Sequence, residues 1–279
     1  MRFDYNMIKA GVVGWPIEQS KSPIIHNHWL KKYSINGSYE RISCEPKDFS
    51  NCINKLIELD YAGVNITVPF KEKALEISNT VTDCAHKIGA ANTLIFKDGK
   101  ILADNTDAIG FISNLRTQAP EWSADKGTAL ILGAGGASRS VIFSLLNEDT
   151  PKIILTNRTR ERAENLAVKF GKKITVIDWS DISLYLSDVK TIVNTTSLGM
   201  LGHSELKLDT INLNSETLVT DIVYNPLRTV LLEDAYKKGC TTVDGLGMLL
   251  YQAVPGFKKW FGIEPKVTKA LRTEVLLAL

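Results

Sequence analysis

Residues Thr128–Val141 read TALILGAGGASRSV, and this stretch decides the fold of the second half of the chain. A short apolar run ends at Gly133, a glycine-rich turn follows, and small residues lead into an apolar helical pattern. This order predicts a strand, a tight turn and a helix, with Gly135 allowing the backbone to approach a phosphate. The N–H groups at the start of the helix favour that negative charge. A dinucleotide-binding turn is therefore expected, and the alternative is an ordinary strand–helix connection.

The third position of this glycine fingerprint is Ser138 instead of glycine. The substitution is compatible with the motif, because the position mainly requires a small residue for helix–strand packing. The expected cofactor contacts in the turn are Gly133, Ala134, Gly135, Gly136 and Ala137.

The composition is that of an ordinary soluble globular protein. The 279 residues can bury two modest cores, so one large or two small domains are expected. With 44% hydrophobic residues, 23% charged residues and a net charge of +2, nothing favours nucleic acid or a membrane surface as a partner. The four cysteines lack metal-ligand spacing, which predicts free thiols in a reducing compartment and no metal site.

The N-terminal apolar stretch is interrupted by Gly11, Gly14 and Pro16, and no run of residues is long enough to span a bilayer. We therefore expect a cytoplasmic protein that acts on a small molecule. The sequence leaves open whether it is a monomer or a homodimer, because it shows no heptad pattern and no long exposed apolar edge.

The first hundred residues alternate between strand-like and helix-like segments, which predicts an open α/β domain over residues 1–107. Ser22 before Pro23 is a helix-start signal, with the serine hydroxyl as the cap. Asp98-Gly99 predicts a hairpin at the edge of the sheet. Strands are expected at 8–14, 38–44, 63–68, 90–96 and 101–104, and helices at 22–33, at 48–60 and from Lys71 through Asp83.

Strands and helices also alternate after residue 107, as a doubly wound parallel sheet requires. This predicts a Rossmann NADP-binding domain over residues 108–243. Residues 244–279 contain two helical patterns, 246–260 and 265–279, which we expect to return to the first domain. The helix of this part is expected at 108–116, and the strands at 129–132, 152–156, 174–177, 191–194, 218–223 and 241–243.

The residues after the second Rossmann strand distinguish the two nicotinamide nucleotides. An NAD-binding domain usually has an acidic residue there for the ribose hydroxyls, whereas this chain has Asn157, Arg158 and Thr159. An arginine at this place favours the 2′-phosphate of NADP, and Arg162 lies one helical turn further on. The alternative is a solvated helix start with ordinary surface arginines.

Polar residues cluster at the strand ends of the first domain, where ligands bind in open α/β sheets. Hydroxyls, amides, an amine and a carboxylate in this set suit a small polyhydroxylated acid. Each also has a structural interpretation: Ser22 and Asp107 as helix caps, and Lys71 as a surface lysine. His26 and His28 are expected to pack or to lie on a helix surface instead of binding metal. The set is Ser20, Ser22, Asn65, Thr67, Lys71, Asn92 and Asp107.

Taken together and in order, these segments resemble the shikimate dehydrogenase family over almost the whole chain. The first-domain motifs are SKSPIIHN at 20–27, NITVPFK at 65–71, GAANT at 89–93 and NTDAIG at 105–110. The glycine turn and NRT at 157–159 resemble the family's NADP signatures, as do NTTSLGM at 194–200 and DGLGML at 244–249.

The resemblance implies roles for single residues. Lys71 and Asp107 are the implied catalytic pair. The substrate carboxylate is assigned to Ser20 and Ser22, the ring hydroxyls to Thr67, Asn92 and Gln252, and the substrate side of the pocket also to Tyr224. Ile222 and Gly245 are assigned to the nicotinamide end, and Asp83 is a further cofactor-side candidate.

The implied reaction is the reversible NADPH-dependent reduction of 3-dehydroshikimate to shikimate, with Lys71 as the proton donor to the developing oxyanion. The sequence leaves open whether Lys71 is charged in the free protein, because burial favours the amine and a neighbouring carboxylate favours the ammonium. It departs from the family at Thr195-Thr196-Ser197, where Ala-Thr-Pro is more usual. The alternatives are a quinate/shikimate dehydrogenase that also uses NAD and a non-catalytic NADP-binding sensor.

Overall fold

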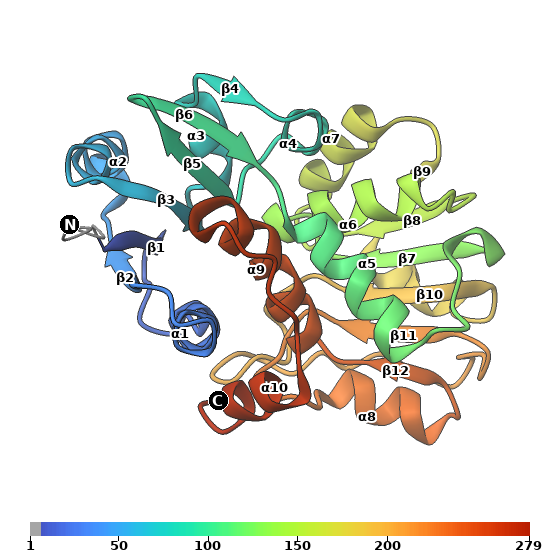
Figure 1. Ribbon diagram of the computed structural model, residues 1–279. Coiled ribbons are helices and arrows are strands. Elements are labelled where there is room, and N and C mark those ends of the chain that lie inside the picture. Colours follow the sequence, from blue (N-terminus) through green and yellow to red (C-terminus); the bar gives the residue numbers. More distant parts are fainter. Residues whose placement is uncertain (1–6) are drawn as a thin grey trace, which may run out of the picture. The chain divides into compact units, whose positions relative to one another are not determined.

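The computed structural model describes residues 7–279 (Figure 1). The chain divides into two compact units, each formed around its own sheet. Unit 1 contains the N-terminal segment through Asp107 together with Leu249–Leu279, and unit 2 contains Ala108–Met248. The segment expected to begin at residue 244 is thus shared, since residues 244–248 belong to unit 2.

Unit 1 has a six-stranded mixed sheet. Strand β1 pairs in parallel with β2 and β3, because a helix connects each successive pair, whereas β5 is antiparallel to both β3 and β6. The order across the sheet is β2 (Gly37–Ser43), β1 (Ile8–Gly14), β3 (Tyr61–Ile66), β5 (Thr93–Lys97), β6 (Lys100–Asp104) and β4 (Thr80–Val81).

The predicted hairpin between β5 and β6 is present. Both turn residues, Asp98 (φ 51°) and Gly99 (φ 69°), adopt the left-handed conformation that a two-residue hairpin turn requires. Its predicted position at the sheet edge was wrong, because Thr80–Val81 pairs in parallel with β6 and forms the edge instead.

The helix predicted from Lys71 through Asp83 is broken into two short helices, α3 (Lys71–Glu76) and α4 (Asp83–Ile88). The backbone between them leaves the helical path because Asn79 exchanges two hydrogen bonds with Ile101, its N–H donating to the carbonyl and its side chain accepting from the amide. Thr82 then caps α4 by accepting a bond from the Ala85 N–H at 3.3 Å.

Helices cover both faces of the unit 1 sheet. On one face α2 (Phe49–Glu58) and α3 pack on apolar residues of β1, β3 and β6. On the other face α1 (Ser22–Lys32) and the unit 1 part of α9 (Leu246–Phe261) form an aromatic cluster with β2. The last helix, α10 (Lys269–Leu276), lies beside α1. The C-terminal helices therefore belong to the packing of the first sheet.

Unit 2 has six strands that are all parallel. Numbered within the unit, their order is 6-5-4-1-2-3, the order of a dinucleotide-binding Rossmann sheet. The order in which successive strands are added to the sheet reverses between β7 and β10, and ligands bind at this switch point in such sheets. The strands are β12 (Thr241–Val243), β11 (Leu218–Asp221), β10 (Val189–Asn194), β7 (Thr128–Leu132), β8 (Ile153–Thr156) and β9 (Ile174–Val176).

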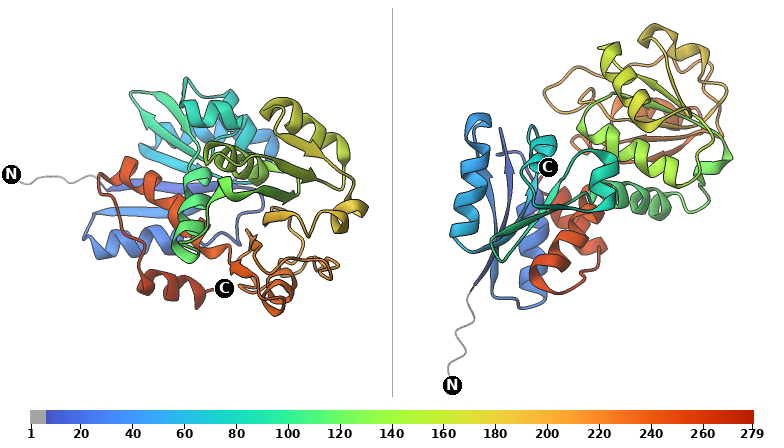
Figure 2. Two further views of the ribbon diagram at one scale, coloured as in Figure 1. Left: turned by 90° about the vertical axis from the view of Figure 1, so that its right-hand side faces the viewer. Right: turned by 90° about the horizontal axis from the view of Figure 1, so that it is seen from above.

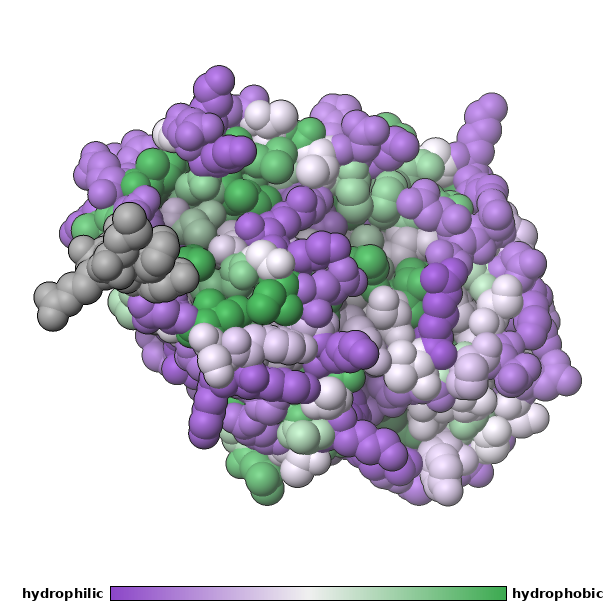
Figure 3. Space-filling model, viewed as in Figure 1, coloured by the Kyte–Doolittle hydropathy of each residue, from purple (hydrophilic) through white to green (hydrophobic). Residues whose placement is uncertain are grey.

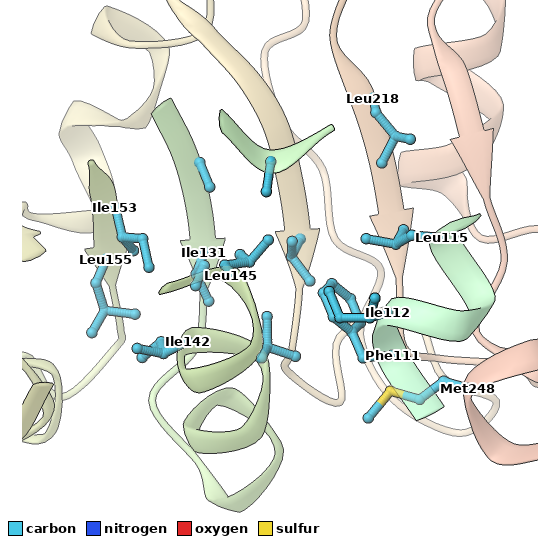
Figure 4. Close-up of a cluster of buried hydrophobic side chains, with 14 of the residues drawn as sticks. Phe111, Ile112, Leu115, Ile131, Ile142, Leu145, Ile153, Leu155, Leu218 and Met248 are labelled. Carbon is cyan, nitrogen blue, oxygen red and sulfur yellow. The ribbon is translucent and has the colours of Figure 1, made fainter. Parts of the chain in front are cut away.

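Strict alternation along the buried strands builds two cores in unit 2. Ile131 points to the face covered by α5 (Asp107–Gln118), α6 (Gly136–Asn147) and α7 (Arg160–Phe170), as the close-up in Figure 4 shows for part of this core. Leu130 and Leu132 point to the opposite face, which α8 (Val230–Lys237) covers. Figure 2 gives two further views of these layers.

Hydrophilic and hydrophobic residues are interspersed over the face drawn in Figure 3. Within residues 7–279, no helix has both the length and the apolar character needed to cross a membrane.

Candidate active site

The central feature of unit 1 is an ion pair between the first residues of two helices. Lys71 begins α3 and Asp107 begins α5, and Lys71 Nζ lies 2.6 Å from Asp107 Oδ2. Their side chains are 19% and 9% exposed, so both groups are shielded from water but reachable by a ligand. The cap interpretation of Asp107 does not account for these contacts, because its carboxylate is engaged by side chains of other elements.

Asn92, just before β5, organises the groups around this pair. Its Nδ2 donates to Asp107 Oδ1 at 2.9 Å and to Gln252 Oε1 at 3.2 Å. Its Oδ1 accepts from the Thr106 N–H at 2.8 Å and from Thr93 Oγ1 at 3.0 Å. The amide is therefore held in one orientation, and the predicted residues Lys71, Asn92, Asp107 and Gln252 form one continuous cluster.

Gln252 reaches the cluster from α9. A structural interpretation of this helix places Met248 in the core and Gln252 on the surface. Met248 does pack into the core of unit 2, but Gln252 is buried in unit 1 beside Asn92. Its Nε2 donates to the Leu249 carbonyl, which fixes the direction of its Oε1.

The loop carrying Ser20 and Ser22 is held by Arg41 of β2, whose Nε and Nη2 donate to the Ser20 carbonyl at 2.9 and 2.7 Å. The prediction that the Ser22 hydroxyl caps α1 was wrong. Lys21 is the cap residue and makes no side-chain cap bond, and Ser22 is the first helical residue and is buried.

Two predicted residues of unit 1 lie outside the buried network. Thr67, half-buried after β3, accepts a backbone bond from Phe70 and has its methyl group against Gly14. Asp83 is exposed in the first turn of α4.

Three residues of the network have no role assigned from the sequence, although Asn65 belongs to the set of polar residues at strand ends. Asn65, Thr93 and Thr106 are buried and hydrogen-bonded around Asn92. All three lie within the family-like motifs, so the motifs were the available signal. A fourth residue of the network, Tyr39, bonds Asn65 through its hydroxyl, and no motif in the sequence pointed to it.

His26 is a packing residue, as predicted. Its ring stacks on Tyr39 at a centroid distance of 3.9 Å and meets Trp29, Phe257 and Trp260 at 5.7–5.8 Å. Burial lowers the pKa of His26 to about 3. His28, by contrast, lies near the surface and pairs with Glu274 of α10.

Because this imidazole is buried, we expect the stability of unit 1 to be sensitive to acid. The folded state excludes a proton that unfolded His26 binds with a pKa near 6.5, so stability falls as pH drops from about 6.5 towards 3. Between pH 7 and pH 5 the loss from His26 is about 2 kcal/mol. Urea unfolding at both pH values should show a smaller loss in His26→Phe than in the wild type. His28→Asn is the control and should keep the full loss, and an equal loss in His26→Phe would contradict the assignment.

In unit 2 the glycine turn has the predicted form of strand, turn and helix. Gly133 directly follows β7 and has φ 107°, and a Cβ there would lie 2.8 Å from Thr195 Oγ1, so only glycine fits. Gly135 and Gly136 are exposed with open space where a Cβ would be, at the N-terminus of α6. This turn has the room and the free N–H groups that a pyrophosphate requires.

The residues after β8 are of two kinds: one polar side chain that holds the glycine turn, and exposed arginines. Asn157 Oδ1 accepts from the Ala134 N–H at 3.1 Å, and its Nδ2 donates to the Thr159 carbonyl at 2.8 Å, so this side chain braces the glycine turn. Arg158 and Arg162 are exposed and make no ion pair with any residue that the structure describes. They are therefore available to an anionic group.

The loop after β10 meets the glycine turn at the switch point. Thr195 Oγ1 donates to the Leu132 carbonyl at 2.8 Å, and Asn194 Oδ1 accepts from both the N–H and the hydroxyl of Thr196. The departure from the usual family sequence thus leaves a well-bonded loop at this position.

The remaining predicted contacts lie just after β11 and β12. Gly245 packs on the backbone of Ile222, where a Cβ would lie 2.4 Å from the carbonyl oxygen. Ile222 and Tyr224 are half-buried, and burial raises the pKa of Tyr224. Burial also raises the pKa of Asp221 to about 6, although three groups donate hydrogen bonds to it.

A Rossmann unit joined to a second α/β unit that carries a shielded Lys–Asp pair is typical of nicotinamide-dependent dehydrogenases. Three family models match in succession: the shikimate dehydrogenase substrate-binding domain over 12–94, shikimate/quinate 5-dehydrogenase over 116–223 and the shikimate 5′-dehydrogenase C-terminal domain over 245–273. The chain belongs to the shikimate dehydrogenase family.

Similar proteins cover nearly the full chain. The NADP(+) shikimate dehydrogenase of Ruegeria sp. (strain TM1040) is 51% identical over 268 residues, which are 96% of this chain and 97% of that protein. Shikimate 5-dehydrogenase from Thermus thermophilus, solved with NADP(H) and shikimate, has a TM-score of 0.88 and 33% identity over 98% of this chain and all of that one. Quinate dehydrogenase from Corynebacterium glutamicum, solved with NAD, has a TM-score of 0.90 and 28% identity over 98% and 99% of the two chains.

Proposed function

We propose that this chain catalyses the reversible reduction of 3-dehydroshikimate to shikimate with NADPH, in the biosynthesis of chorismate and the aromatic amino acids. The observation that carries the proposal is the cluster of Lys71, Asp107, Asn92 and Gln252, which offers an ammonium beside amide groups suited to ring hydroxyls. We place the enzyme in the cytoplasm, as a monomer or a homodimer.

The catalytic role falls on the ion pair. The bound nicotinamide nucleotide supplies the hydride. As negative charge develops on the carbonyl oxygen, the Lys71 ammonium stabilises it and donates a proton. Asp107 accepts a hydrogen bond from Lys71 Nζ and from Asn92 Nδ2, so it orients both groups. In the reverse direction Lys71 must be the neutral amine, which accepts the proton from the shikimate hydroxyl and becomes the ammonium.

The other residues bind and orient. Ser20 and Ser22 would hold the substrate carboxylate, Thr67, Asn92 and Gln252 the ring hydroxyls, and Tyr224 would line the substrate side. The pyrophosphate fits the turn from Gly133 to Ala137, and Ile222 and Gly245 would contact the nicotinamide. Asp83 remains a weaker candidate on the cofactor side. Asn157 and Thr159 shape the adenosine end, and Arg158 with Arg162 supplies charge for the 2′-phosphate.

The proposal is tested by the appearance of reduced nicotinamide when purified protein meets shikimate and NADP. Quinate and NAD serve as the controls. Oxidation of shikimate with a clear preference for NADP is the expected result. Equal use of quinate or NAD would favour the dual-specificity alternative, and NADP binding without turnover would favour a sensor.

Gly135→Ala gives a prediction that isolates the cofactor turn. Its φ of −93° suits any residue, and a Cβ there meets no protein atom within 4 Å, so the melting temperature should not change. The added methyl group would occupy space needed by the pyrophosphate, so the KM for NADP should rise about tenfold or more. Gly99→Asn, in the hairpin of unit 1, is the control for a glycine outside the cofactor turn. An unchanged KM for NADP in Gly135→Ala would contradict this placement of the pyrophosphate.

A further inference from the structure

Arg41 of β2 chelates one backbone oxygen of the loop that carries Ser20 and Ser22. Its Nε and Nη2 both donate to the Ser20 carbonyl oxygen, at 2.9 and 2.7 Å. A carbonyl oxygen has two lone pairs, so one rigid guanidinium uses both of them. Because a peptide bond is planar, these two bonds fix the orientation of the whole peptide plane between Ser20 and Lys21.

Lys21 lies between the two serines, but its ammonium is engaged by another part of unit 1. Lys21 Nζ donates to the carbonyl oxygen of Ala278, two residues after the end of α10. The cation nearest to the serines in sequence is therefore bonded to the C-terminal segment, and the cation bonded to the Ser20 backbone comes from β2.

The Ser20 hydroxyl depends on the peptide plane that Arg41 holds. The Ser22 N–H donates to Ser20 Oγ in a long bond of 3.4 Å, which requires the intervening Ser20–Lys21 peptide to keep its orientation. The Ser20 oxygen accepts in this bond, so the hydroxyl hydrogen is left for another acceptor. A carboxylate is such an acceptor, because it only accepts hydrogen bonds.

Within residues 7–279, Arg41 forms no ion pair that would compete with its bonds to Ser20. Its exposed side chain lines a surface cavity together with Lys31 of α1 and Glu274 of α10. The Glu274 carboxylate pairs with His28 instead of Arg41. The guanidinium is therefore committed to the Ser20 carbonyl.

We propose that Arg41 is a positioning residue, which holds the Ser20 hydroxyl in the orientation that donates to the substrate carboxylate. This inference rests on the proposed function of the site. It assigns to Arg41 part of the strength of carboxylate recognition, and it leaves the hydride-transfer step to the Lys71 cluster.

The test begins with Arg41→Met, which keeps an unbranched apolar stem and removes the guanidinium. The KM for shikimate and its dissociation constant should rise about 5-fold to 10-fold, the loss expected when a charge-assisted bond no longer orders the loop. The value of kcat should change less than about twofold, and the KM for NADP should match the wild type.

Two measurements distinguish positioning from a general loss of structure. Methyl shikimate has an ester in place of the carboxylate, so its KM should change less than about twofold in Arg41→Met. In a Ser20→Ala background, Arg41→Met should have no further effect on the KM for shikimate, because the hydroxyl that it positions is already absent. Melting curves of all variants check that they are folded.

Lys31→Met is the matched control for charge. Lys31 is exposed and lines the same cavity, but its ammonium does not bond the Ser20 carbonyl. Its removal takes away one positive charge from the same surface and should leave the KM for shikimate within about twofold of the wild type.

Several results would overturn the role of Arg41. They are an unchanged or lower KM for shikimate in Arg41→Met, an equal loss on methyl shikimate, additive effects with Ser20→Ala, or an equal loss in Lys31→Met. Calorimetry with shikimate alone separates this inference from the proposed function. Wild-type protein that binds shikimate no better than Arg41→Met overturns only the inference, whereas wild-type protein that neither binds nor oxidises shikimate overturns both.

Discussion

Lys71→Ala is expected to lower kcat for shikimate oxidation by a factor of about 10²–10⁴, the usual contribution of a positioned acid–base group. The KM for shikimate should change by less than about threefold, because the ring hydroxyls keep Asn92 and Gln252. Lys71 Nζ lies 2.6 Å from Asp107 Oδ2, and the Lys71 side chain is only 19% exposed, so no exposed lysine elsewhere on the surface can take its place. Steady-state kinetics in both directions provide the measurement.

Lys73→Ala is the matched control for this experiment. Lys73 lies on the same helix α3 and has its ammonium over the Phe49 ring, away from Asp107. Its removal should leave kcat within about twofold of the wild type, as for a surface substitution. Normal turnover in Lys71→Ala, or an equal loss in both variants, would show that Lys71 is not the proton donor.

The glycine turn illustrates what could be predicted from the sequence alone. The conformation of this turn is determined by neighbouring residues, because the apolar run, Gly133 and the small residues of α6 each favour their own backbone conformation. The same holds for Asp98-Gly99, whose turn conformation follows from two residues. The position of that hairpin within the sheet was wrong, since it depends on the pairing of β4 with β6, which is set by distant residues.

The active-site cluster was only partly predictable, for the same physical reason. Lys71, Asn92 and Asp107 lie at strand ends and helix starts, so their convergence follows from topology. Tyr39 lies within a strand, and nothing in its neighbourhood in sequence reveals that its hydroxyl meets Asn65 from β3. The Ser22-Pro23 signal located the start of α1 but not its cap residue, because the helix begins one residue earlier than the signal predicts, with Lys21 as the cap.

Arg158→Ala is expected to lower the ratio of kcat/KM for NADP to kcat/KM for NAD by about 10-fold to 100-fold. This factor corresponds to the free energy of one charge-assisted hydrogen bond. Arg158 is exposed at the end of β8 and makes no ion pair with the described part of the chain, so its guanidinium is free for a phosphate. NAD lacks the 2′-phosphate, so the kinetics with NAD should not change. The measurement is the nucleotide dependence of shikimate oxidation.

Arg160→Ala is the control for charge alone, because Arg160 is two residues away but already engaged. Its Nε lies 2.8 Å from Glu164 Oε1, and its Nη1 lies 2.7 Å from Asp178 Oδ1. Removing it should leave the preference for NADP intact. A change with NAD as large as that with NADP in Arg158→Ala would mean that Arg158 supports the loop instead of reading the phosphate. If Arg162→Ala alone carries the loss, the phosphate contact lies one helical turn further along α7, and Arg158 has no part in selecting the nucleotide.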